Sequence, residues 1–110
     1  MKSRQAVRLA LATLILSMGL VAHAGDVVEV SIDKMKFEPQ HVRIKPGTTI
    51  KWINRERRNN HSVLFGKEGY AESERMFPGE SWQRTFDKPG IYPYTCGPHP
   101  EMSGVVEVVE

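Results

Sequence analysis

The stretch Phe37–Asn54, which reads FEPQHVRIKPGTTIKWIN, decides the fold class of this chain. Val42 and Ile44 alternate with polar residues before a Pro-Gly dipeptide, and Ile50 and Trp52 do so after it. Apolar residues at a period of two predict half-buried β-strands, and a Pro-Gly dipeptide predicts a turn. The segment therefore predicts two strands joined by a short connection.

The same pattern continues on both sides of this stretch. Further strand-like runs lie at residues 28–32, 61–65, 82–86, 92–96 and 106–109. Pro-Gly dipeptides at 78–79 and 89–90 separate some of them, and only residues 66–75 lack the pattern. There we expect a loop or one short helical turn. Six or seven short strands without an amphipathic helix indicate an all-β domain, an antiparallel sandwich or a barrel.

The first 24 residues have the order of a secretory signal peptide. Three basic residues precede the apolar run Leu9–Val21, and Ala22-His23-Ala24 follows with the small-x-small pattern of a cleavage site. The alternative is a membrane anchor, but the run is shorter than the roughly 20 residues that a spanning helix needs. We predict that residues 1–24 are removed on export and that residues 25–110 form one domain without a membrane span.

The formal charge of the whole chain, +2, depends on that leader. Without the leader's three basic residues the charge becomes about −1. The sequence has no basic stripe with interleaved aromatic residues, which is the mark of a nucleic-acid surface. We therefore expect no nucleic-acid partner. We also expect the protein to be a monomer.

One loop combines three metal-binding side chains. Cys96, His99 and Met102 follow one another at intervals of three between two predicted strands, so a loop can gather their donor atoms around one point. His61, which follows a polar loop, can supply the fourth donor. A thiolate, two imidazoles and a thioether form the donor set of blue-copper electron-transfer sites. We predict that these four residues hold one copper ion, which alternates between Cu(I) and Cu(II).

The single cysteine supports this interpretation. Cys96 has no partner for an internal disulfide, and a free thiol is a liability in the oxidising compartment to which an exported protein goes. A role as metal ligand would explain why it is kept.

Each donor also has a plainer interpretation. A lone cysteine is often a small buried hydrophobe, and methionines such as Met35 and Met76 are usual core fillers. His41 is expected to be a solvated surface residue. Zinc would accept cysteine and histidine but rarely a thioether, and a cysteine nucleophile activated by histidine would leave Met102 without a role.

Other functions fit the sequence less well. Copper trafficking or tolerance is the main alternative, although the chain has no tract rich in methionine or histidine. A metal-free structural sandwich would leave Cys96 unexplained. An enzyme is not expected, since a metal with four protein ligands has no open position for a substrate.

These segments resemble the cupredoxins, and within them the plastocyanin-like proteins of the amicyanin group. Residues 37–54 resemble the family's stretch before its first histidine ligand, and Cys96–Met102, CGPHPEM, resembles the short amicyanin ligand loop with both prolines. The resemblance implies a Greek-key β-sandwich with copper near one end. It also implies a periplasmic shuttle that accepts electrons from a dehydrogenase and passes them to a c-type cytochrome or an oxidase. Loop 55–60 and Glu101 depart from the family pattern where a partner would dock.

The two histidines are expected to differ. We expect His61 to be buried, and His99, between Pro98 and Pro100, to be exposed as the exit for the electron. In the resembled proteins with short loops this histidine can protonate and leave Cu(I), and we expect the same here. Pro98 has no N–H that could bond to the Cys96 sulfur, which bears on the reduction potential.

Residues around the ligands are expected to support them. Asn54 and Ser62 are candidates for tying the two ligand segments together, with ordinary turn chemistry as the alternative. Arg55, Arg57 and Arg58 are candidates for a basic rim that steers an acidic partner, with a solvated loop as the alternative.

Overall fold

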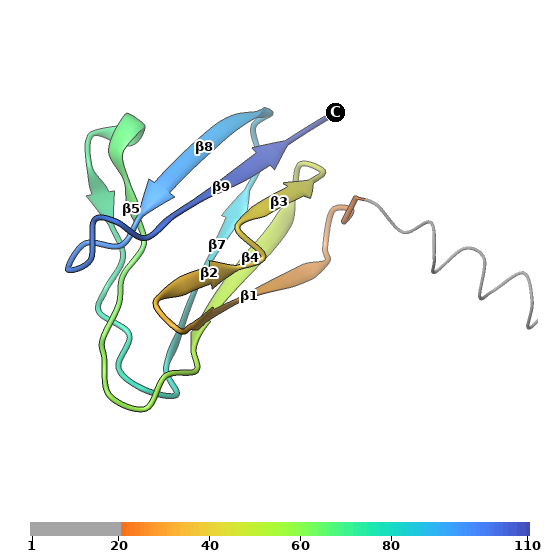
Figure 1. Ribbon diagram of the computed structural model, residues 1–110. Helices are drawn as coiled ribbons and strands as arrows, with labels where there is room; N and C mark the ends of the chain where they lie inside the picture. The colour runs from red at the N-terminus through yellow and green to blue at the C-terminus, as the bar shows by residue number, and fades with distance from the viewer. Residues whose placement is uncertain (1–20) are drawn as a thin grey trace, which may run out of the picture.

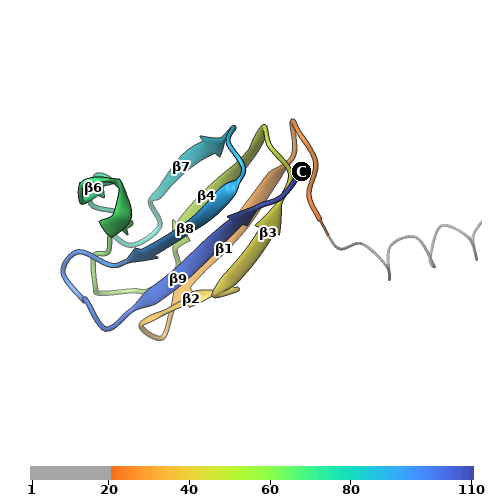
Figure 2. The ribbon, with the colours of Figure 1, turned by 90° about the horizontal axis from the view of Figure 1, so that it is seen from above.

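The computed structural model describes residues 21–110, which form a sandwich of two β-sheets (Figure 1). The first sheet has the order β2-β1-β4-β7, with bounds Lys36–Glu38, Val27–Asp33, Thr48–Asn54 and Ser81–Phe86. The second has the order β3-β9-β8-β5-β6, with bounds His41–Ile44, Ser103–Val108, Gly90–Thr95, Leu64–Phe65 and Ala71–Glu72. Figure 2 shows the strands of both sheets running along the same long direction of the sandwich. The predicted all-β sandwich is therefore confirmed.

The period of two in the sequence places the core between the sheets. Along β4, buried and half-buried residues alternate strictly, so that Ile50, Trp52 and Asn54 face inward. The Trp52 ring is fully buried and meets the rings of Phe65 and Tyr94 at centroid distances of 6.3 and 5.4 Å. Edge-to-face packing of such rings adds to the free energy gained by burying their area.

Two strand pairs differ from the predicted antiparallel arrangement. β1 pairs with β4 in parallel, and β3 pairs with β9 in parallel. An alternating sequence shows which side chains share a face, but it does not show which strands are neighbours. The prediction was therefore right for the layers and wrong for these two pairings.

Residues 66–75, which lack a strand pattern, combine a turn and a short strand. They begin with the 3-10 turn η1, Gly66–Glu68, and continue into the two-residue β6. Arg84 of β7 fixes η1, because its guanidinium donates to both Glu68 carboxylate oxygens at 2.7 and 2.9 Å. The same guanidinium lies 4.6 Å from the centre of the Phe65 ring. This contact joins the two sheets at one edge of the sandwich.

The predicted signal peptide lies mostly outside the described residues. Of its last residues, Ala22 accepts a hydrogen bond from the Lys45 N–H and His23 accepts one from the Asp26 N–H. Cleavage after Ala24 stays a prediction. Within residues 21–110 there is no helix of the length and apolarity that crossing a membrane requires.

Candidate metal centre

The ligand loop between β8 and β9 is closed by its own backbone. The Cys96 N–H donates to the Met102 carbonyl at 3.1 Å, and the Met102 N–H donates to the His99 carbonyl at 2.9 Å. Cys96 and Met102 are buried in the core, whereas His99 is half-buried. The loop thus begins and ends inside the sandwich, and its middle, from His99 to the exposed Pro100 and Glu101, lies toward the surface.

The fourth predicted ligand comes from a neighbouring segment. His61 and Met76 exchange two backbone hydrogen bonds, at 3.1 and 2.8 Å, in an isolated antiparallel bridge. The His61 side chain has no exposed surface. In Figure 1 the segment leading into β5 lies beside the loop that follows β8, and Leu64 of β5 pairs with Thr95 of β8. This pairing sets His61 beside Cys96.

Three of the four predicted donor atoms converge. The Cys96 Sγ lies 3.5 Å from the His61 Nδ1 and 3.6 Å from the His99 Nδ1. The ligand atoms of these three residues all lie within 4.8 Å of one another. Donors about 2.0–2.3 Å from one ion at angles near 115° would be about 3.6 Å apart. The spacing therefore fits ligation of a single metal ion, and Met102 is buried at the end of the same loop.

A carboxylate that the sequence did not predict holds the buried histidine. The Glu56 Oε1 lies 2.6 Å from the His61 Nε2, and the Glu56 Oε2 accepts the Met35 N–H at 2.6 Å. Since an ionised carboxylate only accepts, Nε2 carries the ring proton and Nδ1 presents its lone pair toward Cys96. The only sign of Glu56 in the sequence is that one acidic residue stands among three arginines, five positions before His61.

The environment keeps Glu56 ionised. Burial alone would raise the pKa of Glu56, but the hydrogen bonds from His61, the Met35 N–H and Asn59 lower it below its usual value. The carboxylate is therefore available as an acceptor throughout the neutral range. It also fixes the orientation of the ring that faces the site.

Of the two candidate supporting residues, Ser62 links the ligand segments and Asn54 does not. The Ser62 N–H donates to the Cys96 Sγ at 3.4 Å, and the Ser62 Oγ accepts the Gly97 N–H at 3.0 Å. Asn54 is buried, and its side-chain amide donates to the Met76 carbonyl and accepts from the Glu56 N–H. Asn54 thus shapes the loop that presents Glu56.

The arginines of the candidate basic rim differ in whether their charge is paired. The Arg55 side chain turns toward β1, where it donates to the Ser31 hydroxyl at 3.0 Å and to Glu29 at 3.3 Å. Arg57 and Arg58 are exposed. Arg55 is exposed as well, but Glu29 partly compensates its charge, and a steering role for the three arginines stays a prediction.

Burial also determines the state of the free cysteine. It raises the pKa of the Cys96 thiol, although the Ser62 and His99 N–H groups oppose the shift. A buried thiol with a raised pKa is a poor nucleophile, which argues against the cysteine-nucleophile interpretation. A coordinating metal ion would deprotonate it outright.

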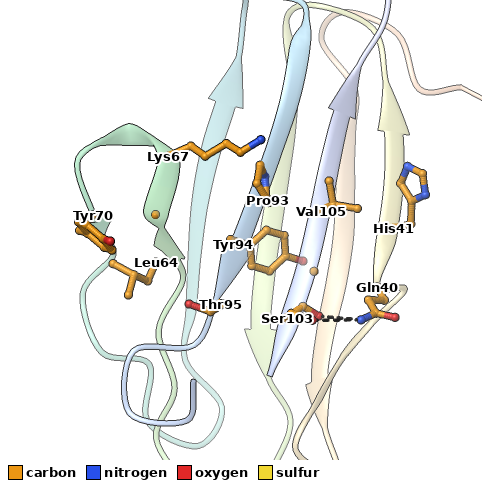
Figure 3. Close-up of a pocket in the computed structure, with 12 residues that line it drawn as sticks. Gln40, His41, Leu64, Lys67, Tyr70, Pro93, Tyr94, Thr95, Ser103 and Val105 are labelled. Carbon is orange, nitrogen blue, oxygen red and sulfur yellow. Dashed lines mark hydrogen bonds between the residues drawn. The ribbon is translucent and has the colours of Figure 1, made fainter. Parts of the chain in front are cut away.

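Two other features lie outside this centre. His41 is exposed and bonds to Glu107 at 3.1 Å, as expected of a surface residue. A groove of about 750 Å³ runs over the outer face of the second sheet, and Figure 3 shows Leu64, Tyr70 and Thr95 along it. None of the four predicted ligands lines this groove.

Comparison with known proteins points to a copper-binding family. The family model described as copper-binding proteins of the plastocyanin/azurin family matches residues 24–109. Amicyanin-alpha of Methylorubrum extorquens is 40% identical over 84 residues, which cover 73% of this chain and 70% of the relative.

Solved structures show the same likeness. The crystal structure of amicyanin from Paracoccus versutus matches with a TM-score of 0.70 and 39% identity, over 77% of this chain and 83% of that one. A copper-containing nitrite reductase from Thermus scotoductus matches with a TM-score of 0.69 and 29% identity, over 76% of this chain but only 22% of the reductase. The chain belongs to the plastocyanin/azurin family of copper-binding proteins.

Proposed function

We propose that His61, Cys96, His99 and Met102 hold one copper ion and that the protein carries one electron at a time between other redox proteins. The observation that carries this proposal is the position of the Cys96 Sγ, 3.5 and 3.6 Å from two imidazole Nδ1 atoms. With the Met102 thioether from the same loop, this is the donor set of a blue-copper electron-transfer site. Copper bound there would supply a one-electron couple.

The protein contributes a rigid frame for that couple. Glu56 and the Met76 backbone fix His61 on one side. The two backbone hydrogen bonds within the ligand loop fix Cys96 and Met102 on the other. Burial of these side chains excludes water. A frame that changes little between the two oxidation states keeps the reorganisation energy small, which favours fast transfer.

The half-buried His99 is the proposed route for the electron. It lies between Pro98 and Pro100, and the neighbouring Glu101 is exposed. A small apolar surface around one ring edge suits a brief encounter more than a stable complex. We propose a dehydrogenase as electron donor and a c-type cytochrome or an oxidase as acceptor, met in the periplasm after removal of residues 1–24.

The same ligand set supports a carrier role rather than an enzyme. Four protein donors leave no open coordination position for a substrate. The copper-containing nitrite reductase that shares this fold is a much longer chain, of which the present fold covers 22%.

The direct test is the visible spectrum of the protein after addition of Cu(II). We expect an intense band near about 600 nm, as for a thiolate-copper site, bleached by ascorbate and restored by an oxidant. Cys96→Ser should abolish the band. A colourless wild-type protein, or only the weak colour of copper on nitrogen and oxygen, would contradict the proposal and favour copper trafficking or another metal.

A further inference from the structure

We propose that the carboxylate of Glu72, acting through the Ser62 hydroxyl, orients the Cys96–Gly97 peptide and lowers the reduction potential of the copper centre. Glu72 contacts none of the four proposed ligands and is a positioning residue. The inference rests on the proposed copper site. It assigns a role to a residue of β6, a strand that the sequence did not predict.

A chain of hydrogen bonds leads from Glu72 to the ligand loop. The Ser62 hydroxyl donates to the Glu72 Oε2 at 2.6 Å and accepts the Gly97 N–H at 3.0 Å. A hydroxyl has one proton to donate. With that proton directed at Glu72, the oxygen lone pairs of Ser62 remain available for the Gly97 N–H, which directly follows Cys96.

Glu72 and Ser62 fill the space that a side chain at position 97 would need. A Cβ atom at position 97 would collide with the Glu72 Oε2 and would lie 2.7 Å from the Ser62 Oγ. Gly97 is not among the glycines with a positive φ, so its backbone does not require glycine. The Glu72 carboxylate occupies the place of the missing side chain, and Glu72 and Gly97 form a matched pair.

The strand register brings the carboxylate to this place. Glu72 pairs with Leu64 of β5, and Leu64 pairs with Thr95 of β8, next to Cys96. The side chain of Glu72 is 37% exposed. Its nearest cation is the half-exposed Arg75, whose Nε lies 3.8 Å from the Glu72 Oε2. Such a distant and exposed pair leaves much of the negative charge uncompensated.

This charge should affect the two oxidation states of copper differently. A nearby negative charge stabilises Cu(II), which carries one more positive charge than Cu(I). Removing the charge should therefore raise the reduction potential. Because the carboxylate is partly exposed, we expect a modest change of roughly three- to tenfold in the equilibrium between the two states. Tenfold corresponds to about 59 mV for a one-electron couple.

The first experiment measures the potential of copper-loaded Glu72→Gln at low and high salt. Gln keeps an oxygen that accepts from Ser62 but removes the charge, so the blue band should persist while the potential rises. The rise should shrink as salt screens the charge, which a purely structural effect would not do. Glu74→Gln is the matched control, because Glu74 is an exposed carboxylate two residues away. Equal potentials for the two variants would overturn the proposal.

A second experiment uses the matched pair. Gly97→Ala should displace the carboxylate and also raise the potential. In the Glu72→Gln background, Gly97→Ala should add clearly less than it does alone, since both changes remove the same interaction. Full additivity would show that Glu72 and Gly97 act independently and would overturn the proposal.

A third measurement needs no copper. In the metal-free protein, the Gly97 amide should exchange with solvent more slowly in wild type and Glu72→Gln than in Glu72→Ala. Equal exchange in all three would overturn the orienting role. A wild-type protein without the blue band would instead contradict the proposed function, so the two failures can be told apart.

Discussion

The two histidines of the proposed metal centre have the same donor atom facing Cys96 but opposite surroundings. His61 has no exposed surface, and its Nε2 is bonded to the buried carboxylate of Glu56. His99 is half-buried at the middle of a short loop. One histidine is therefore fixed from behind by the protein, while the other meets solvent.

This difference shows how the proposed metal centre can be rigid on one side and accessible to solvent on the other. The His61 side supplies the fixed geometry, because backbone, carboxylate and core all constrain the ring. The His99 side would provide the proposed edge for the passage of an electron. The expected release of His99 on protonation stays a prediction, and it concerns only the side that solvent can reach.

The largest expected effect comes from removing each ring in turn. His61→Gly and His99→Gly should both abolish the strong visible band of the copper-loaded protein. Added imidazole should restore the band in His99→Gly, because the gap opens to solvent, and not in His61→Gly, where the gap is sealed. The spectrum measures both outcomes. Restoration in both variants would remove the distinction between the two sides.

The next effect concerns the support behind His61. Glu56→Ala leaves the Met35 N–H and the His61 Nε2 without their acceptor. Loss of a charged acceptor from buried donors should lower the free energy of unfolding by about 3 kcal/mol. Urea unfolding of the metal-free protein measures it. The control is Glu101→Ala on the exposed side, which should change stability by less than about 0.5 kcal/mol.

The same carboxylate predicts how stability depends on pH. The pKa of Glu56 is lower in the folded state than its usual value, so its contribution is complete above that value and is lost as the pH falls through the lowered one. The stability difference between metal-free wild type and Glu56→Gln should therefore shrink as the pH falls below the usual glutamate pKa of 4.5. A constant difference across that range would show that Glu56 acts through its shape and not its charge.

The smallest effect is expected on the exposed side, at Pro98. Pro98→Ala introduces an N–H beside the Cys96 sulfur, which already accepts one from Ser62. A second donor should stabilise Cu(I) by about 1 kcal/mol. This changes the equilibrium constant between Cu(II) and Cu(I) by about fivefold in favour of Cu(I), so the reduction potential rises. Voltammetry of the copper-loaded variant measures this shift. An unchanged or lower potential would mean that the new N–H points away from the sulfur.

The sequence was sufficient to group three of the four candidate donors because these three share one loop. Cys96, His99 and Met102 are so close in the chain that no knowledge of long-range contacts is needed to group them. His61 was proposed as the fourth donor because it follows a polar loop and begins a predicted strand. The two faces of each strand were likewise predictable, because alternation is a local property.

Features that depend on distant contacts were missed. Glu56 reaches His61 only because loop 55–60 folds back under the turn at Met35, and Glu72 reaches Ser62 only through the pairing of β5 with β6. The pairing of Arg55 was missed for the same reason, since its partners lie on β1. No local pattern in the sequence encodes these contacts.

The position of β9 has a consequence for the order in which the molecule is completed. β9 is the last strand of the described fold, yet it lies inside the second sheet, between β3 and β8. A chain that is synthesised from its amino end presents this strand last, and pairings between distant segments close late in folding. β3 cannot be joined to β8 until β9 pairs with both of them, and Met102 directly precedes β9 in the chain. The final step that assembles the sandwich is therefore also the step that would complete the proposed ligand set.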